Sequence, residues 1–276
     1  MVQWRCDDCA AHKCLCSVCC RDNHTALPFH RVRHWNGRFY QRSSLWRVGV
    51  KIHLGHQGVP CPFYVGGDPD NICDPASDVP TTQLDSSEQD GQSLYEGQDP
   101  YEEDMEEYDE EDMEEECSFR RGPSRDEQGN QFITVVDVSG IHRLPVVRCN
   151  CRDTADDILF MEQELFPSTF SAIQTVFTFA VLKDYRVSNL ECKVTAYHYY
   201  QKIRRTTSPT FPKSVPDRYH EFRRVSRQWR NLKLRQRSGA GHESLDKWPG
   251  IMALFCSACP QPGINVEPNW ETDVNQ

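Results

Sequence analysis

The chain has 276 residues, of which 38% are hydrophobic and 26% are charged, and it contains 14 cysteines. Its longest apolar stretch, Thr175 to Leu182, is too short to cross a bilayer, and its N-terminus lacks the apolar run of a signal peptide. We therefore expect no membrane association and a reducing compartment. Disulfides are disfavoured there, so clustered cysteines with interleaved histidines indicate metal chelation.

The net charge of −10 is distributed unevenly. The stretch from Asp68 to Glu116 holds 21 acidic residues and neither lysine nor arginine, which leaves 20 acids and 31 bases in the rest, a balance of +11. Residues 67–131 are therefore predicted to form a disordered acidic insert, because such a run repels itself and buries little. A solvated linker is the simpler interpretation, and a strap that folds back on a basic face is the alternative.

Residues 1–66 are predicted to form a zinc-binding module with a B-box-like or ZZ-like start. Each Cys-x2-Cys pair places two thiolates at the reach of one tetrahedral Zn²⁺. The pattern leaves the pairing of ligands open: one ion takes four ligands, and Cys14, Cys20 and His12 are candidates to complete a second ion. Filled coordination by protein favours structural zinc. The six main candidates are Cys6, Cys9, Cys16, Cys19, His24 and His30.

Residues 132–276 are predicted to contain the rest of the domain. Valines and leucines on either side of Ser139 and Gly140 indicate a β-hairpin. Residues 155–237 are expected to be helical, with a first helix that Pro167 ends and a buried core helix that starts near Ser168. The predicted fold is therefore α+β: small zinc-stabilised β and knuckle modules, a helical middle and a C-terminal Cys-x2-Cys knuckle.

A second, discontinuous set of candidate ligands follows the first. The Cys-x-Cys and Cys-x2-Cys pairs are its stronger members, because adjacent thiols gain little from simple packing. A lone histidine in a strand is a weaker candidate. The set comprises His53, His56, Cys61, His142, Cys149, Cys151, Cys256 and Cys259.

The segment 218–237 carries eight basic residues and one acid. As a helix it would align Phe222, Val225, Trp229 and Leu232 in one apolar stripe. Its arginines suit phosphate contacts, and a solvated face of an amphipathic helix is the equal alternative. The candidate nucleic-acid residues are Arg223, Arg224, Arg227 and Arg230.

No catalytic pattern is evident in the sequence. It has neither a G-x4-G-K-S/T phosphate loop nor a G-x-G-x2-G motif. Cysteines and histidines occur as chelating pairs rather than as a nucleophile with a base, so no catalytic residue and no organic cofactor are predicted.

Six motifs in one order carry a family resemblance: LPFHRVRHWNGRFY, LWRVGVKIHLGHQGVPCP, VSGIHRLPVVRCNC, LFPSTFSAIQTVFTFAVL, RSGAGH and CSACPQPGIN. Together they resemble the CxC-type cysteine cluster, second type, at the N-terminus of KDZ (Kyakuja–Dileera–Zisupton) transposases, chiefly of fungi. The resemblance implies a zinc-chelating module that precedes an RNase H-like catalytic domain. The acidic insert departs from the family, in which the connection between the GH…CP motif and the GIH motif is usually short.

The resemblance implies chelation by His56, Cys61, His142, Cys149, Cys151, Cys256 and Cys259, preceded by the N-terminal set. The chain ends at Gln276, where the catalytic domain would begin, so we expect no enzymatic activity. The leading hypothesis is a noncatalytic nuclear module with two to four structural zinc ions, which binds DNA or a transposase catalytic chain. The alternative is a zinc-dependent module that binds protein, for example chromatin protein, and a nuclease or ligase is a weaker third hypothesis.

Overall fold

The computed structural model describes residues 3–62, 123–149, 151, 155–239 and 266. Two units are distinguished, Met1–Arg223 and Arg224–Gln276, and the boundary lies within the last helix. The predicted C-terminal knuckle and the predicted acidic insert up to residue 122 lie outside the described residues.

The N-terminal part forms a small antiparallel sheet with the strand order β2-β1-β3-β4. The Trp4 side chain is fully buried beneath it, and its indole N–H donates to the Ser17 hydroxyl at 3.1 Å. This bond joins the first strand to the start of the first helix. The elements are β1 (Trp4–Cys6), β2 (Cys14–Leu15), α1 (Ser17–His24), β3 (Val32–Trp35), β4 (Tyr40–Ser43) and the 3₁₀ turn η1 (Leu45–Val48).

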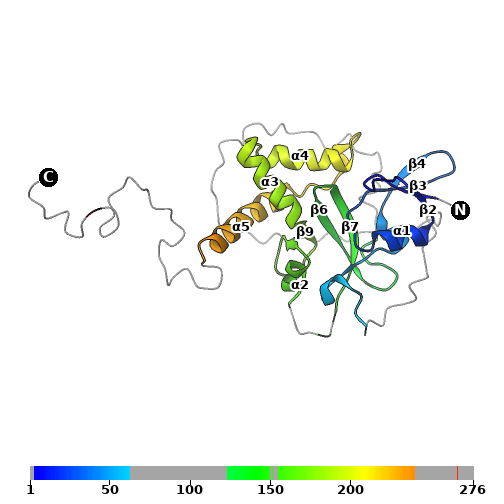
Figure 1. Ribbon diagram of the computed structural model, residues 1–276, viewed down its shortest axis with the longest axis horizontal. Coiled ribbons are helices and arrows are strands. Elements are labelled where there is room, and N and C mark those ends of the chain that lie inside the picture. Colours follow the sequence, from blue (N-terminus) through cyan, green and yellow to red (C-terminus); the bar gives the residue numbers. More distant parts are fainter. Residues whose placement is uncertain (1–2, 63–122, 150, 152–154, 240–265, 267–276) are drawn as a thin grey trace, which may run out of the picture. The chain divides into compact units, whose positions relative to one another are not determined.

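A second sheet follows with the strand order β5-β7-β6-β9-β8. Its centre is the predicted hairpin, which turns at Val138 and Ser139 and runs through the middle of Figure 1. Strand β5 pairs with β7 in parallel and so adds the N-terminal part to this sheet. The strands are β5 (Ile52–His53), β6 (Gln131–Asp137), β7 (Gly140–Val147), β8 (Leu165–Pro167) and β9 (Thr175–Thr178).

The helical middle differs from its prediction between residues 163 and 178. The first helix ends at Glu162, and Leu165–Pro167 is a strand. The expected core helix begins only at Phe179, because the preceding β-branched run TVFT extends as β9 and the Thr178 hydroxyl caps the helix by accepting from the Val181 N–H. The helices are α2 (Asp156–Glu162), α3 (Phe179–Glu191), α4 (Ala196–Thr207) and α5 (Tyr219–Arg237), and 3₁₀ turns occur at η2 (His56–Gly58) and η5 (Pro212–Ser214).

Both faces of the second sheet are buried. Successive residues of a strand point to opposite faces, and Val135 and Val176 pack in one core with Trp4 and Phe160. On the opposite face Phe177 contacts Phe222, whose ring also contacts three tyrosines of α3 and α4, namely Tyr185, Tyr199 and Tyr200. The sheet is therefore the middle layer, with the N-terminal part and α2 on one face and α3, α4 and the start of α5 on the other. The predicted α+β class is confirmed.

The acidic insert was predicted to extend to residue 131, and its last residues are folded. The Asp126 carboxylate accepts from the Gln128 and Asn130 backbone N–H groups, and it pairs with the Lys51 ammonium at 2.9 Å. These bonds close a turn that leads into β6. The local Asp-x-x-Gly turn therefore outweighs the polar composition on which the boundary was placed.

Among the described residues, no helix is both long and apolar enough to span a membrane.

The Phe222 side chain gives a test of the helical layer. Replacing it with alanine removes an aromatic ring from the contacts with Phe177 and the tyrosines, so Phe222→Ala should lower the free energy of unfolding by about 3–5 kcal/mol. Val187→Ala, at an exposed site on α3, is the matched control and should change it by less than about 0.5 kcal/mol. Denaturant unfolding measures both, and equal small effects would contradict the packing described.

Candidate metal centres

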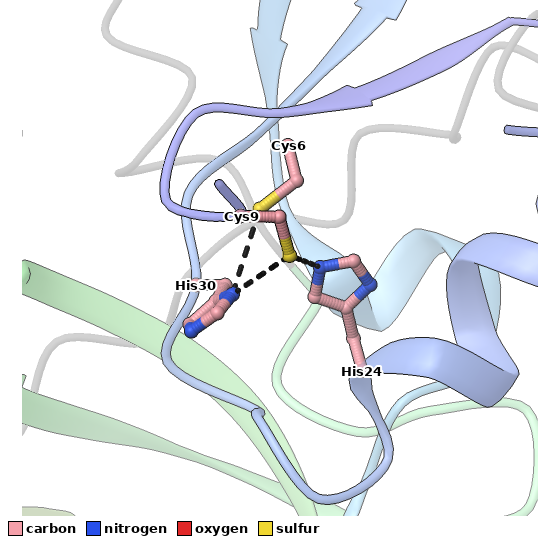
Figure 2. Close-up of side chains that lie close together, drawn as sticks. All are labelled: Cys6, Cys9, His24 and His30. Carbon is pink, nitrogen blue, oxygen red and sulfur yellow. Dashed lines mark hydrogen bonds between the residues drawn. The ribbon is translucent and has the colours of Figure 1, made fainter. Parts of the chain in front are cut away.

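The first candidate centre consists of Cys6, Cys9, His24 and His30. Cys6 ends β1, Cys9 lies in the turn after it, and His24 is the last residue of α1. His30 precedes β3, whose Val32 pairs with Cys6 across the sheet. Figure 2 shows the four side chains converging from these elements. We call this group the N-terminal tetrad.

The distances in the N-terminal tetrad fit a tetrahedral ion. The Cys9 Sγ atom lies 3.5 Å from His24 Nε2 and 3.5 Å from His30 Nδ1, and Cys6 Sγ lies 3.5 Å from His30 Nδ1. Zinc bonds of about 2.3 Å to sulfur and about 2.0 Å to nitrogen at tetrahedral angles place sulfur and nitrogen about 3.5 Å apart. The residues present therefore match the size of a zinc ion.

The environment of the tetrad orients one histidine ligand and disfavours a thiolate unless a cation is bound. The His24 Nδ1–H donates to the Cys20 carbonyl oxygen at 2.7 Å, which leaves Nε2 to face the sulfurs. Burial raises the pKa of the Cys6 thiol to about 11, so this thiol is neutral at pH 7 unless a positive charge compensates the thiolate. A bound divalent ion supplies that charge.

The other N-terminal candidates lie outside the tetrad. Cys16 caps α1 by accepting from the Cys19 N–H at 3.4 Å, and the Cys14 thiol lies 3.3 Å from the Tyr40 hydroxyl. Cys20 is buried, and burial raises its pKa to about 12. The remaining candidate is His12, whose ring Nδ1 lies 3.2 Å from the Cys6 carbonyl oxygen.

The second candidate centre consists of His56, Cys61, Cys149 and Cys151. It is placed by strand pairing. The parallel register aligns His53 with Val147, and parallel strands end at the same edge of a sheet. The residues that follow each strand therefore meet, although about 90 positions separate them in sequence. We call this group the hairpin tetrad.

The chain bends sharply to bring His56 to the hairpin tetrad. Gly55, His56, Gln57 and Gly58 all have positive φ values, of 81°, 45°, 58° and 84°. A side chain at Gly55 would place its Cβ 3.1 Å from the Cys149 Cβ, so only glycine allows this close approach. Non-glycine residues in this conformation are strained, which is typical of ligand clamps.

The hairpin tetrad is more compressed than the first. The His56 Nε2 atom lies 3.0 Å from Cys149 Sγ, and the sulfurs of Cys61 and Cys151 are 3.3 Å apart. A tetrahedral zinc site separates two sulfurs by about 3.8 Å, so the ligands fit an ion after a shift of about half an ångström. The Cys151 N–H donates to Cys149 Sγ at 3.3 Å, as in a metal-binding knuckle. Hydrogen bonds to Cys61 and then to Cys149 raise the pKa of Cys151 to about 12.

Two predicted ligands are placed elsewhere. His53 Nδ1 is buried without a hydrogen-bond partner in the described residues, and His53 belongs to neither tetrad. His142 lies on β7, where its Nε2 is 2.9 Å from the Ser139 hydroxyl and its ring contacts Phe29. Ser139 in turn lies 2.6 Å from the Asp137 carboxylate. His142 therefore belongs to a polar network of the hairpin turn.

The predicted basic helix is present as α5. Phe222, Val225 and Trp229 are buried along the predicted stripe. Arg224, Arg227 and Arg230 are exposed, whereas Arg223 is half-buried. Cys256 and Cys259 lie outside the described residues.

Residues 114–210 match the family model described as CxC2 like cysteine cluster associated with KDZ transposases. The resemblance predicted from the sequence is confirmed over this stretch. The CxC2-like segment contains the hairpin, α2 to α4, and the two hairpin-tetrad cysteines that follow β7. The matched model describes a cysteine cluster and not a catalytic domain. No curated protein and no solved structure matches the chain.

His142 gives a pH test that separates it from the metal ligands. Burial lowers its pKa to about 4 against an ordinary value of about 6.5. Between these values the unfolded chain binds the proton and the folded chain does not, so stability is full above about pH 6.5 and falls as the pH decreases. Each pH unit within the window costs up to about 1.4 kcal/mol.

The matched variant is His142→Gln, which does not titrate. Below pH 6.5 its free energy of unfolding should fall less steeply than that of the unmodified chain, while its metal content at pH 7 stays the same. Parallel denaturant curves at several pH values measure the first, and native mass spectrometry measures the second. Loss of one metal ion in His142→Gln would show that His142 is a ligand after all.

Proposed function

We propose that the chain is a noncatalytic zinc-chelating module that helps a KDZ-type transposition complex bind DNA. The observation that carries this proposal is the convergence of two Cys/His tetrads. Two of the four residues of the hairpin tetrad lie in the CxC2-like segment. Mixed thiolate and imidazole ligands in a tetrahedral arrangement favour zinc over magnesium or calcium, which prefer oxygen. In a nucleus, zinc would remain bound because thiols stay reduced.

The ligand sets support a structural rather than a catalytic role for zinc. Each tetrad supplies four protein ligands, so no coordination position remains for an activated water molecule. The N-terminal tetrad would tie β1, α1 and the segment before β3 together. The hairpin tetrad would fix the end of β5 against the end of β7. Further ions, up to four in all, would involve the cysteines outside both tetrads.

The DNA-binding part of the proposal rests on charge. Outside the stretch from Asp68 to Glu116 the chain has a balance of +11, and α5 exposes Arg224, Arg227 and Arg230. Phosphate contacts of this kind give affinity that depends strongly on salt. The acidic stretch favours a second candidate function, binding of a basic protein partner such as a chromatin protein, in which DNA is not contacted directly.

The metal ligands are tested by counting ions. Native mass spectrometry of chain purified without added zinc should find at least two zinc ions. Cys9→Ser and Cys149→Ser should each lose one ion, and the double variant should lose two, because a tetrad with three ligands binds much more weakly. Cys192→Ser, at an exposed thiol outside both tetrads, is the matched control and should lose none. Equal metal content in the unmodified chain and all four variants would contradict the assignment.

The DNA contact is tested by salt dependence. The logarithm of the association constant of the full chain for a 20-base-pair duplex should fall linearly with log[salt]. The variant Arg224→Gln/Arg227→Gln/Arg230→Gln should flatten that slope by about 0.9 for each phosphate contact removed. Fluorescence anisotropy measures both. Binding to histone proteins without any to DNA would support the second candidate function instead.

A further inference from the structure

A cavity of about 390 Å³ lies where the N-terminal part meets the hairpin. Its lining comes from β4 and η1 on one side and from β7 and the end of α4 on the other. It shares one lining residue, His30, with the N-terminal tetrad and none with the hairpin tetrad. This volume lies within the range of small-molecule sites in proteins, which begins at about 300 Å³.

The lining of the cavity is strongly basic. Four arginines line it, Arg31, Arg42, Arg47 and Arg143, and no aspartate or glutamate does. The carboxylates of Asp7 and Asp8 act on Arg42 from outside the cavity, but they are paired with Arg33 at 2.8 Å and with Arg31 at 2.6 Å. In the part of the chain that the structure describes, Arg42 and Arg47 form no ion pair.

These arginines are held in place by neutral groups. The Arg42 guanidinium donates to the Thr206 carbonyl oxygen at 3.1 Å, and the Arg47 guanidinium lies 5.2 Å from the centre of the Trp46 ring. Arg143 donates to the Pro123 carbonyl oxygen at 2.9 Å and also lies over the Phe132 ring. These contacts restrict the orientation of the guanidinium groups and do not neutralise their charges.

Two serines that lie between Arg42 and Arg47 in sequence add hydroxyl groups to the lining of the cavity. Ser43 and Ser44 line the cavity between Arg42 and Arg47, and the Ser44 side chain makes no capping hydrogen bond to the η1 turn that it precedes. Ser139 also lines the cavity, but its hydroxyl already donates to the Asp137 carboxylate at 2.6 Å.

We propose that this cavity is a phosphate-binding site, in which Arg42 and Arg47 are the principal ligands and Ser43 and Ser44 donate to the remaining oxygens. Planar guanidinium groups match the oxygens of a phosphate in pairs, and such charge-assisted bonds are strong. The exposed side chains of Gln41 and Arg42 place the site within reach of a large ligand. This inference rests on the proposed function in one respect: the phosphate that it assigns is that of a DNA backbone.

The experiment compares two probes on the zinc-loaded full chain. Inorganic pyrophosphate tests the site by isothermal titration calorimetry, and a 20-base-pair duplex tests the DNA source by anisotropy over a range of salt. Arg42→Gln/Arg47→Gln is the test variant, and Arg42→Lys/Arg47→Lys retains the charge. Arg38→Gln, at an exposed position between β3 and β4 that does not line the cavity, is the matched control. Equal zinc content verifies that each variant is folded.

We expect the glutamine pair to weaken pyrophosphate binding at least tenfold and to flatten the salt slope of DNA binding by about 1.8. The lysine pair should recover part of both, and Arg38→Gln should change neither. If the unmodified chain binds pyrophosphate but not DNA, and the glutamine pair loses pyrophosphate binding, the cavity is a phosphate site whose ligand is not DNA. If the glutamine pair leaves DNA binding unchanged, the cavity is not the site of DNA contact, whereas the proposed function stands. Absence of both would overturn the proposed site together with the DNA-binding part of that function.

Discussion

The parallel pairing of Ile52 and His53 with Val146 and Val147 is the contact on which the rest of this structure depends. It is short, and the two strands are separated by a long stretch of sequence, so closing that loop costs entropy that two residue pairs hardly recover. The pairing is extended by the Leu54 N–H, which donates to the Val147 carbonyl oxygen at 2.9 Å. A metal ion bound immediately beyond the pair, by residues that follow both strands, would stabilise this pairing further.

The same contact explains how the hydrophobic core is divided. With β5 in place, the N-terminal part covers one face of the sheet, and residues as distant as Trp4 and Phe160 share a core. The helices cover the other face through Phe177 and Phe222. A sheet buried on both faces has no surface left for solvent at its centre, so its strands are rich in valine and isoleucine. Loss of the N-terminal cover would expose the part of that face that α2 does not cover.

The sequence was sufficient to predict the elements whose signals are local. The hairpin around Ser139 and Gly140 and the apolar stripe of α5 follow from spacing alone, whereas chelation by the cysteine pairs stays a prediction. The break between β9 and α3 was missed, because an apolar run such as TVFTFAVL has no period that distinguishes strand from helix. Only the pairing of Val135 with Val176 makes the first half a strand.

The membership of each tetrad depended on tertiary contacts. Spacing favoured Cys16 and Cys19 as much as Cys6 and Cys9, yet the thiol of Cys16 faces the backbone of its own helix. His142 could not be separated from the ligands, since only its strand register shows that it faces Phe29. The basic cavity was not anticipated, because arginines at positions 42, 47 and 143 meet only after the sheet has formed. One signal was present: RSSLWR places two serines between two arginines.

The hairpin tetrad lies only partly within the CxC2-like segment. The matched residues, 114–210, contain Cys149 and Cys151 but not His56 or Cys61, which lie before the acidic stretch. Two thiolates alone do not fill a tetrahedral site. A metal ion at the hairpin tetrad would therefore need ligands from the N-terminal part as well, and the pairing of β5 with β7 brings these residues together. The functional unit that we propose is accordingly larger than the matched segment, and it would include the residues that line the basic cavity at the same junction.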